Sequence, residues 1–418
     1  MRIGVVGLGY VGLVTASVLA DQGHIVLGVD VDRQKVELLS RGVSPIYEPG
    51  LDELLKKNRD RLKFTTDHTE LRDCEVVFIA VPTPTKISGE IDLSYLFDAV
   101  KRLVDIGYGG IIAIKSTVLP GTARKVEEIT GLPVVSNPEF LREGSAVYDA
   151  IHPDRVIVGS RDKNAGDVVE EVYSFTKAPV IRTTPEVAEL IKYAANAFLA
   201  VKLSFINEIA NLCEKIEGCD VEVVARGIGL DKRIGPNYLK AGLGYGGSCL
   251  PKDTKALTYF ARQLGEPLVI VEAAMRVNEE RIPRVVKRAE ELVGDLRGKT
   301  ICVLGLAFKE NTDDIRESQA IKLVKRLREL DAVVKAYDPK ALDNALRLVD
   351  FVPAKSVEEC LEGSKLAIIA TGWDEFREKI SEELLLRLGV KAMIDARRVL
   401  DPNKFRKVRF RAIGLYAR

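Results

Sequence analysis

The chain has 418 residues, too many for one typical hydrophobic core, so we expect two or three domains. Lys and Arg number 62 against 61 Asp and Glu, and this formal net charge of +1 argues against a dedicated nucleic-acid-binding protein. No run of about 18 apolar residues occurs, and the apolar opening is too short for a signal peptide, so we expect a cytoplasmic protein without a membrane span.

The first part of the chain alternates short apolar runs with helical stretches. Residues 2–6 predict a strand that runs into glycines, a helix follows through Ala20, and residues 25–29 predict a second strand that ends at Asp30. Further strands are expected at residues 76–81, 111–114, 134–135 and 155–158. Alternating strands and helices indicate a mostly parallel, doubly wound sheet, which we assign to an N-terminal Rossmann-like domain, residues 1–185.

The pattern changes after Pro185. Residues 186–216 contain no Gly or Pro and repeat apolar positions at helical spacing, which predicts one helix of roughly 30 residues. More helix is expected from Val221 and over residues 252–293, with a glycine-rich loop at 235–247 between them. We therefore expect a central helical domain, residues 186–295, that connects two domains or forms a dimer interface.

An α/β pattern returns at Lys299 and predicts a second Rossmann-like domain, residues 296–418. One strand runs into Gly305 and the next ends at Asp338, just as the first two strands of the N-terminal domain run into Gly7 and end at Asp30. The second copy lacks the full glycine pattern. The other expected elements are a helix at 318–330 and strands at 333–337, 366–370 and 392–394. The predicted fold class is α/β, with two Rossmann-like doubly wound domains joined by a long central helix and a helical middle domain.

Gly7, Gly9 and Gly12 form a GxGxxG motif that follows a strand and opens a helix, with Asp30 eighteen residues further on. The first glycine permits a tight turn, the second lets the backbone approach a pyrophosphate, and the third allows the helix to pack on the strand. Asp30 would bind the adenosine ribose and repel a 2′-phosphate, so the motif predicts NAD rather than NADP, a preference that nearby Arg33 weakens. The alternative is a purely structural glycine turn.

Two polar segments could carry chemistry. Residues 137–144 form a Pro- and Gly-bounded loop with two carboxylates, Glu139 and Glu143, which could act as acid–base groups, bind a sugar, or simply face solvent. Lys192 and Asn196 share one helical face, where an ammonium and an amide could form an oxyanion site; the alternative is an exposed position.

The third segment is the glycine-rich run at residues 244–253, whose glycines could allow close backbone approach to a ligand. Cys249 lies at a predicted helix start, where a thiolate is stabilised, and Asp253 follows four residues later. A nucleophilic cysteine beside an NAD site indicates oxidation at the aldehyde level through a thiohemiacetal and a thioester. The alternative is a packed core thiol, and most of the other five cysteines are expected to be reduced and buried; they include no CxxC pair, so no metal site is expected.

Around these residues the chain closely resembles the UDP-glucose 6-dehydrogenase family, within the larger UDP-glucose/GDP-mannose dehydrogenase family. Eight motifs occur in the family order: GLGYVGL (7–13), VPTP (81–84), KSTV (115–118), NPEFLREG (137–144), ELIKYAANAFLA (189–200), the cysteine segment (244–253), FKENTDDIRES (308–318) and DARRVLD (395–401). The resemblance implies oxidation of C6 of UDP-glucose to the carboxylate of UDP-glucuronate with two NAD, in a homodimer or higher homo-oligomer.

The resemblance also implies roles for single residues. Cys249 would be the covalent nucleophile, Asp253 with Thr117 and a water would assist proton removal, Lys192 and Asn196 would stabilise oxyanions, and Glu139 would activate water. The implied cofactor contacts are Gly7, Gly9, Tyr10, Val11, Gly12, Asp30, Arg33, Pro82, Thr83, Ser116, Thr117, Glu143 and Arg316. The implied substrate contacts are Glu139, Phe140, Leu141, Lys192, Asn196, Arg233 (reaching the neighbouring subunit), Tyr238, Leu239, Lys240, Gly244, Gly246, Lys252, Lys309 and Arg397.

Several alternatives stay open. GDP-mannose and UDP-N-acetylhexosamine 6-dehydrogenases share many of these motifs. A non-catalytic nucleotide-sugar sensor would predict loss of Cys249, Lys192 or Asp253, and all three are present. A redox-sensing NAD protein would predict a resolving cysteine near Cys249, and no nearby sequence position supplies one.

Overall fold

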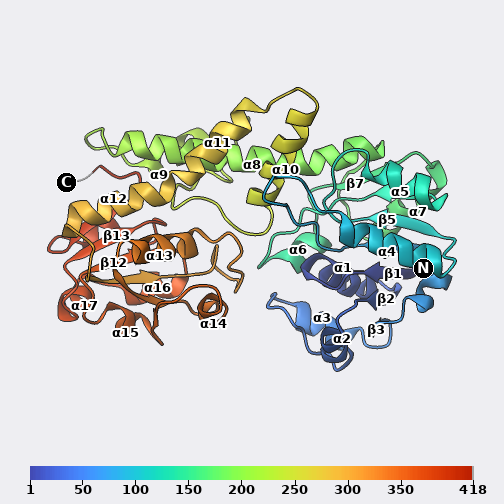
Figure 1. Cartoon of the computed structure of the whole chain (residues 1–418), viewed down its shortest axis with the longest axis horizontal. Helices are drawn as coiled ribbons and strands as arrows, with labels where there is room; N and C mark the ends of the chain where they lie inside the picture. Colours follow the sequence, from blue (N-terminus) through green and yellow to red (C-terminus); the bar gives the residue numbers. More distant parts are fainter. Residues whose placement is uncertain (417–418) are drawn as a thin grey trace. The chain divides into compact units, whose positions relative to one another are not determined.

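The computed structural model describes residues 1–416, and the chain divides into two compact units (Figure 1). Unit 1 consists of residues 1–195 and 255–266, and unit 2 consists of residues 196–254 and the described residues from 267 onward. The division into three domains with boundaries at 185 and 295 remains a prediction. In the described residues, no helix combines the length and the apolar character that crossing a bilayer requires.

Unit 1 is built on an eight-stranded sheet. Its strands are β1 (Arg2–Val6), β2 (Ile25–Val29), β3 (Leu62–Thr65), β4 (Val76–Ile79), β5 (Ile111–Ile114), β6 (Val134–Ser136), β7 (Val156–Ser160) and β8 (Val180–Thr183). Its helices, apart from its shares of two longer ones, are α1 (Tyr10–Asp21), α2 (Arg33–Ser40), α3 (Leu51–Lys57), η1 (His68–Asp73), α4 (Ser94–Asp105), α5 (Thr122–Thr130), α6 (Ala146–Ile151) and α7 (Lys163–Val172).

The strand order in this sheet is β3-β2-β1-β4-β5-β6-β7-β8. The first six strands are parallel, in the order expected for a doubly wound dinucleotide-binding fold, and β7 runs antiparallel to β6. Apolar side chains of α1, α3, α6 and α7 form one hydrophobic core with the sheet, and those of η1, α4 and α5 form another. Two separate cores on one sheet are the mark of helices packed on both faces.

Unit 2 contains a six-stranded, fully parallel sheet in the order β11-β10-β9-β12-β13-β14, which repeats the strand order of the first six strands of unit 1. The strands are β9 (Thr300–Leu304), β10 (Val333–Tyr337), β11 (Val352–Pro353), β12 (Leu366–Ile369), β13 (Ala392–Asp395) and β14 (Arg409–Ala412). The helices are α9 (Val221–Gly229), α11 (Val269–Glu279), α12 (Arg281–Val293), α13 (Gln319–Glu329), α14 (Leu342–Leu346), α15 (Val357–Leu361), α16 (Asp374–Lys379), α17 (Glu382–Arg387) and η2 (Pro402–Lys404). The predicted α/β class with two Rossmann-like sheets is confirmed.

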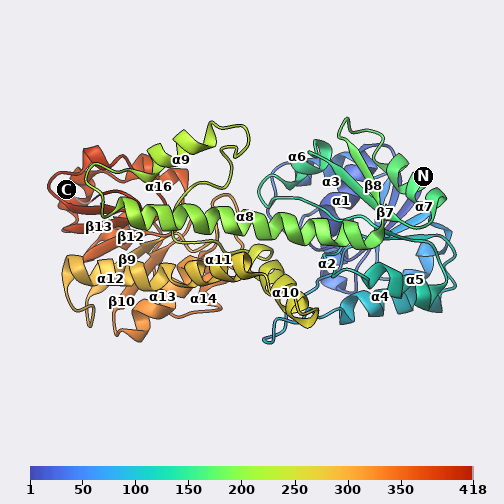
Figure 2. The same cartoon turned by 90° about the horizontal axis from the view of Figure 1, so that it is seen from above.

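Two helices are shared between the units. The predicted long helix is α8 (Pro185–Cys213), which Figure 2 shows as one unbroken helix. The helical stretch expected at 252–293 is divided into α10 (Leu250–Gln263), α11 and α12. The first break follows from Gly265 and Pro267, because glycine takes a positive φ of 79° there and proline lacks the amide that a continuing helix needs.

The expectation that most cysteines are reduced is wrong for two pairs. The structure joins Cys213 to Cys219 and Cys302 to Cys360 in disulfides. Cys302 on β9 and Cys360 on α15 are 58 residues apart in sequence, but packing of the helix on the sheet brings their Cα atoms to 5.5 Å. Sequence spacing does not reveal such a pair because the contact is tertiary. Among the described residues, Cys74 and Cys249 lie outside disulfides.

Glu189 on α8 anchors the loop that precedes α5. Its side chain is buried and accepts hydrogen bonds from the backbone amides of Gly121 and Ala123, each at 2.7 Å. Burial raises the pKa of Glu189 to about 7, even though the two amides favour the charged carboxylate. The folded protein therefore holds this proton more tightly than the unfolded chain, whose glutamate has a pKa of 4.5.

This difference predicts a pH-dependent stability. The contribution of Glu189 is complete below its unfolded pKa and is lost as the pH rises through about 7. We expect Glu189→Gln to flatten the fall in thermal unfolding midpoint between about pH 5 and about pH 8, measured by calorimetry. Glu208→Gln, at an exposed position on the same helix, is the control. Equal slopes in wild type and Glu189→Gln would contradict the assignment.

Candidate active site

The GxGxxG turn of unit 1 lies between β1 and α1, where parallel strands present their carboxyl ends. Gly7 has a φ of 90°, and a Cβ atom there would lie 2.6 Å from the carbonyl oxygen of Ala80. A Cβ atom on Gly12 would lie 1.8 Å from the carbonyl oxygen of Gly7, whereas one on Gly9 would meet no heavy atom within 4 Å. Two of the glycines are therefore required by packing, and Gly9 leaves open space at the helix start, which fits the approach of a pyrophosphate.

Asp30, at the end of β2, holds this turn in place. Its Oδ2 atom accepts hydrogen bonds from the Leu8 amide at 2.7 Å and from Lys35 Nζ at 2.8 Å, and its Oδ1 atom accepts one from the Asp32 amide at 3.0 Å. Burial raises the pKa of Asp30, but Lys35 and the two amides outweigh burial and lower the pKa below its ordinary value. The carboxylate therefore stays charged, and Oδ1 retains a lone pair for a ribose hydroxyl. Arg33, another predicted cofactor contact, is exposed on α2.

The loops after β4 and β5 complete the same edge of the sheet. Thr83 Oγ1 donates a hydrogen bond to the Thr117 carbonyl at 2.9 Å, and Ser116 Oγ donates one to the Val81 carbonyl at 2.8 Å. Tyr10 accepts a hydrogen bond from the Gly144 amide at 2.8 Å. The remaining cofactor candidates of unit 1 are Val11 and Glu143, both half-buried, and Pro82, which is exposed.

Sequence reasoning missed Glu48, whose buried carboxylate accepts hydrogen bonds from the amides of Gly144 and Ala146 at 2.7 and 2.6 Å. These contacts span about a quarter of the chain, and no local signal marks them. Glu48 fixes the end of the 137–144 segment, which also carries Glu143.

A buried ion pair links that segment to α8. Lys192 Nζ donates to the Glu139 carbonyl at 2.7 Å and lies 3.0 Å from Glu139 Oε1, and both side chains are less than a tenth exposed. Glu139 Oε2 accepts the Leu141 amide at 2.6 Å. The Phe140 ring lies 5.3 Å from Lys192 Nζ and 3.6 Å from the Arg155 guanidinium. Glu139, Phe140, Leu141 and Lys192 therefore lie together, as the substrate assignment requires of them.

In unit 2 the predicted nucleophile segment also has defined hydrogen-bond partners. Cys249 is half-buried and directly precedes α10, whose first helical hydrogen bond runs from the Asp253 amide to the Cys249 carbonyl at 2.8 Å. Asp253 is buried, and its two oxygens accept hydrogen bonds from Asn196 Nδ2 and Lys252 Nζ, each at 2.6 Å. The start of a helix stabilises a thiolate, and Cys249 lies at such a start; its role as a nucleophile stays a prediction. Lys192 and Asn196 lie one turn apart on α8.

Packing within the protein also requires the glycines before Cys249, whereas their approach to a ligand stays a prediction. A Cβ atom would lie 2.5 Å from Asn278 Oδ1 at Gly244, 2.3 Å from the Glu317 carbonyl at Gly246, and 2.7 Å from the Phe308 ring at Gly247. The backbone here closely approaches other parts of the protein. The conformation of the cysteine loop therefore depends on packing against residues 308–318.

The other substrate candidates of unit 2 differ in burial and in their contacts. Arg397 donates hydrogen bonds to the carbonyls of Ala370 and Gly244 at 2.8 and 3.1 Å, and burial lowers its pKa to about 10. Leu239 lies in the hydrophobic core, so only its backbone could contact a ligand. Among the remaining substrate candidates, Tyr238 has a φ of 62°, Lys240 is exposed, and Lys309 Nζ lies 5.7 Å from the centroid of the Phe308 ring. Two arginines form ion pairs close by in sequence: the substrate candidate Arg233 with Asp231, and the cofactor candidate Arg316 with Asp314.

Comparison with known proteins agrees with this arrangement. Residues 1–177, 186–280 and 302–402 match, in turn, the NAD binding, central and UDP binding domains of the UDP-glucose/GDP-mannose dehydrogenase family. The UDP-glucose 6-dehydrogenase YwqF of Bacillus subtilis is 43% identical over 392 residues, which cover 90% of this chain and 89% of the relative. The UDP-glucose 6-dehydrogenase of Rhizobium meliloti is 43% identical and covers 98% of both chains.

Solved structures give the same result. A UDP-glucose dehydrogenase from the hyperthermophilic archaeon Pyrobaculum islandicum superposes with a TM-score of 0.91 at 39% identity, covering 99% of this chain and 98% of that one. A UDP-D-ManNAc dehydrogenase from Pyrococcus horikoshii gives a TM-score of 0.88 at 30% identity, covering 99% of both. With three family domains in succession and relatives of this identity along its length, the chain belongs to the UDP-glucose/GDP-mannose dehydrogenase family.

Proposed function

We propose that this protein is an NAD-dependent UDP-glucose 6-dehydrogenase that oxidises C6 of UDP-glucose from the alcohol to the carboxylate of UDP-glucuronate, a four-electron reaction. The observation that carries the proposal is the position of Cys249 at the start of α10, next to the Asp253, Asn196 and Lys252 network. The relatives that are 43% identical and carry the name UDP-glucose 6-dehydrogenase favour UDP-glucose over other nucleotide sugars.

Bound NAD supplies the hydride acceptor for each oxidation, and the residues of the chain do the rest. The Cys249 thiol adds to the aldehyde carbon, so that an S–C bond forms and the carbonyl oxygen takes up the proton. Loss of hydride from that carbon, with the hydroxyl proton, leaves a thioester. Water then breaks the C–S bond, which releases the carboxylate and regenerates the thiol.

The buried polar groups fit the proton transfers that this sequence requires. We assign Asp253, with Thr117 and a water, to proton removal from the C6 hydroxyl, because hydrogen bonds from Asn196 and Lys252, each 2.6 Å long, fix the position of its carboxylate. Lys192 and Asn196 stabilise negative oxygen, and Glu139 activates the water of hydrolysis. The remaining cofactor and substrate assignments, Arg233 in the neighbouring subunit, the homo-oligomer and the cytoplasmic location all stay predictions.

The reaction predicts a stoichiometry. Purified protein incubated with NAD and a panel of nucleotide sugars should reduce about two NAD per UDP-glucose consumed, because alcohol-to-acid oxidation releases two hydrides. NADH absorbance and product mass measure the ratio. GDP-mannose and the UDP-N-acetylhexosamines are the comparison substrates. A stable ratio of one with an aldehyde product, or a faster reaction with another sugar of the panel, would refute the proposal.

A second prediction concerns cofactor choice. Asp30→Ala removes the acceptor for the ribose hydroxyls and leaves Lys35, now 2.8 Å from Asp30 Oδ2, without its partner. A hydrogen bond to a charged group contributes about 1.5–3 kcal/mol, so the NAD-over-NADP preference in kcat/KM should fall about 10- to 100-fold. Adding Lys35→Met should reverse part of this change, because Lys35 would otherwise attract the 2′-phosphate. Wild-type protein that uses NADP as well as NAD would show that Asp30 does not discriminate.

A third prediction isolates the nucleophile. Cys249→Ser keeps the size of the side chain but provides a much poorer nucleophile near neutral pH, so acid formation should fall more than about 100-fold while NAD and UDP-glucose still bind. The variant should stop at the aldehyde or at a covalent ester that intact mass spectrometry detects.

The control for this variant is Cys74→Ser, since Cys74 is the other described cysteine outside a disulfide and is buried in unit 1. Burial raises the pKa of the Cys74 thiol, so iodoacetamide should label Cys249 first. A folded Cys249→Ser protein that forms the acid at the wild-type rate would rule out the covalent mechanism.

A further inference from the structure

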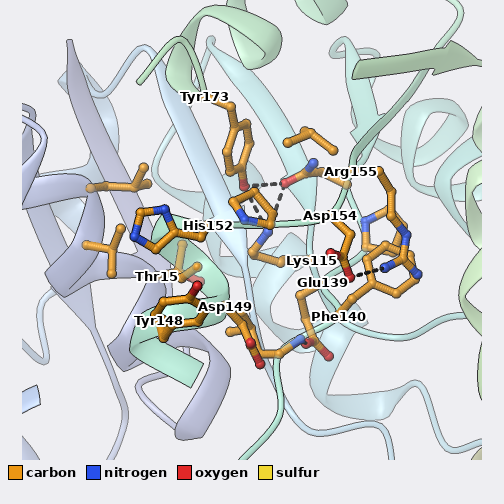
Figure 3. A pocket seen from close by; sticks show the side chains of 18 of the residues that line it. Thr15, Lys115, Glu139, Phe140, Tyr148, Asp149, His152, Asp154, Arg155 and Tyr173 are labelled. Carbon is orange, nitrogen blue, oxygen red and sulfur yellow. Dashed lines mark hydrogen bonds and ion pairs between the residues drawn. The ribbon is translucent and has the colours of Figure 1, made fainter. Parts of the chain in front are cut away.

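A cavity of about 200 Å³ opens on unit 1 beside the Asn137–Arg142 segment (Figure 3). Its rim includes exposed Arg142, Tyr148 and His152, and its floor is formed by buried residues of α1 and by Lys115. No lining residue belongs to the GxGxxG turn, and Asp30, Thr83 and Ser116 do not line it either. The cavity is therefore separate from the predicted cofactor site.

The carboxylates that line this cavity already have their own cations. Glu139 pairs with Lys192 at 3.0 Å, and Asp149 pairs with Arg142 at 2.6 Å. Asp154 is almost fully exposed, with a side chain that is 95% accessible. The negative charges of the wall are thus either neutralised within the protein or surrounded by water.

Two other cations that line the cavity, Lys115 and Arg155, lack a carboxylate partner among the described residues at such short distances. Lys115 is 6% exposed, and within residues 1–416 it forms no ion pair. Its Nζ atom donates to Asn137 Oδ1 at 3.0 Å and to the Tyr173 hydroxyl at 2.8 Å, and it lies 5.3 and 5.8 Å from the rings of Tyr173 and Phe78. Arg155 lies against Phe140, and its closest carboxylate is Asp154 at 4.0 Å.

An unpaired buried ammonium is unusual, because removing its charge from water costs several kcal/mol unless an opposite charge is close. Two neutral oxygens satisfy two of the three donors of Lys115 and leave the third. Tyr173 also donates to Asn137 Oδ1 at 2.6 Å, so the three side chains are mutually fixed (Figure 3). The ammonium is therefore held in one position in the cavity wall.

Part of the wall can contact a flat apolar body. Phe140, Tyr148 and Phe175 line the cavity, together with Val18 and Leu19 on the floor. Arg155 adds a second positive charge beside the Phe140 ring. The wall therefore combines aromatic and aliphatic side chains with about as much polar surface, so it offers both an apolar contact and hydrogen-bonding groups to a small molecule.

We propose that this cavity binds a small organic anion, whose carboxylate takes the remaining hydrogen bond of Lys115 and whose apolar body contacts the aromatic side chains. The cavity shares Glu139, Phe140 and Leu141 with the proposed substrate site. The inference goes beyond the dehydrogenase reaction because Lys115, Tyr173 and the α1 residues, which also line the cavity, have no role in that reaction. The competing explanation is that Lys115 only braces β5 against Tyr173.

Benzoate is the test ligand, and benzamide, of equal shape and without charge, is its control. Titration calorimetry on the wild-type protein should show one benzoate site per chain and at least about tenfold weaker binding of benzamide, since a charge-assisted hydrogen bond is lost. Lys115→Met should weaken benzoate at least about tenfold. Lys125→Met is the matched control, because Lys125 also lies over an aromatic ring, 5.0 Å from the centroid of Phe97, but does not line the cavity.

A crystal structure with 4-iodobenzoate locates the site without any variant, so the test stands even if Lys115→Met does not fold. The anomalous iodine signal should lie in the cavity with the carboxylate at Lys115. Equal binding of benzoate and benzamide, undiminished binding to folded Lys115→Met, iodine at another position, or binding at crystal concentration only would each overturn the proposal.

Discussion

The ion pair between Lys192 and Glu139 is the interaction on which much of unit 1 depends. Both charges are buried, and removing either partner alone would leave an uncompensated charge at a cost of about 3–5 kcal/mol. The pair joins α8 to the loop after β6, and the Leu141 amide completes the coordination of the carboxylate. The adjoining Phe140 ring lies 5.3 Å from Lys192 Nζ and 3.6 Å from the Arg155 guanidinium, so this contact helps to position both the proposed water-activating group and the wall of the anion cavity.

The two Rossmann-like sheets have the same strand order, but the aspartates that follow their second strands differ in their hydrogen bonds. Asp30 accepts two backbone amides and one lysine and keeps a lone pair on Oδ1. In unit 2 the counterpart, Asp338, accepts amides from Leu306 and Ala307 on one oxygen and from Lys340 and Ala341 on the other. The Trp373 indole also donates to Asp338 at 3.1 Å. With five donors on its two oxygens, the second aspartate stabilises the turn after β9.

Sequence patterns predicted the parts of the fold that local periodicity determines. The strand, glycine turn and helix around Gly7 follow from an apolar run and a glycine motif within one βαβ unit, and α8 follows from a long stretch without Gly or Pro. The antiparallel β7 could not be foreseen, since its direction is set by the connection through α6 and not by its composition.

The sequence also could not predict which side chains from distant segments contact the site residues. Glu48, Glu189 and Arg155 carry no local motif, and each makes its contacts through tertiary packing. The cysteine loop illustrates an ambiguity in the glycine signal, because close approach to a ligand and close approach to Glu317 or Phe308 demand the same missing side chain. Candidate residue types were therefore predictable, whereas the neighbours that position them were not.

Neither unit is a continuous stretch of sequence, and this affects how the gene can be divided. The second part of α10 belongs to unit 1, where Tyr259 packs within 3.2 Å of the place that a Cβ atom on Gly89 would occupy. A fragment that ends at residue 195 would therefore encode unit 1 without residues 255–266. Chimeras that exchange whole units between relatives need three junctions, two of them inside helices. Recombination at a single crossover would therefore always divide at least one unit.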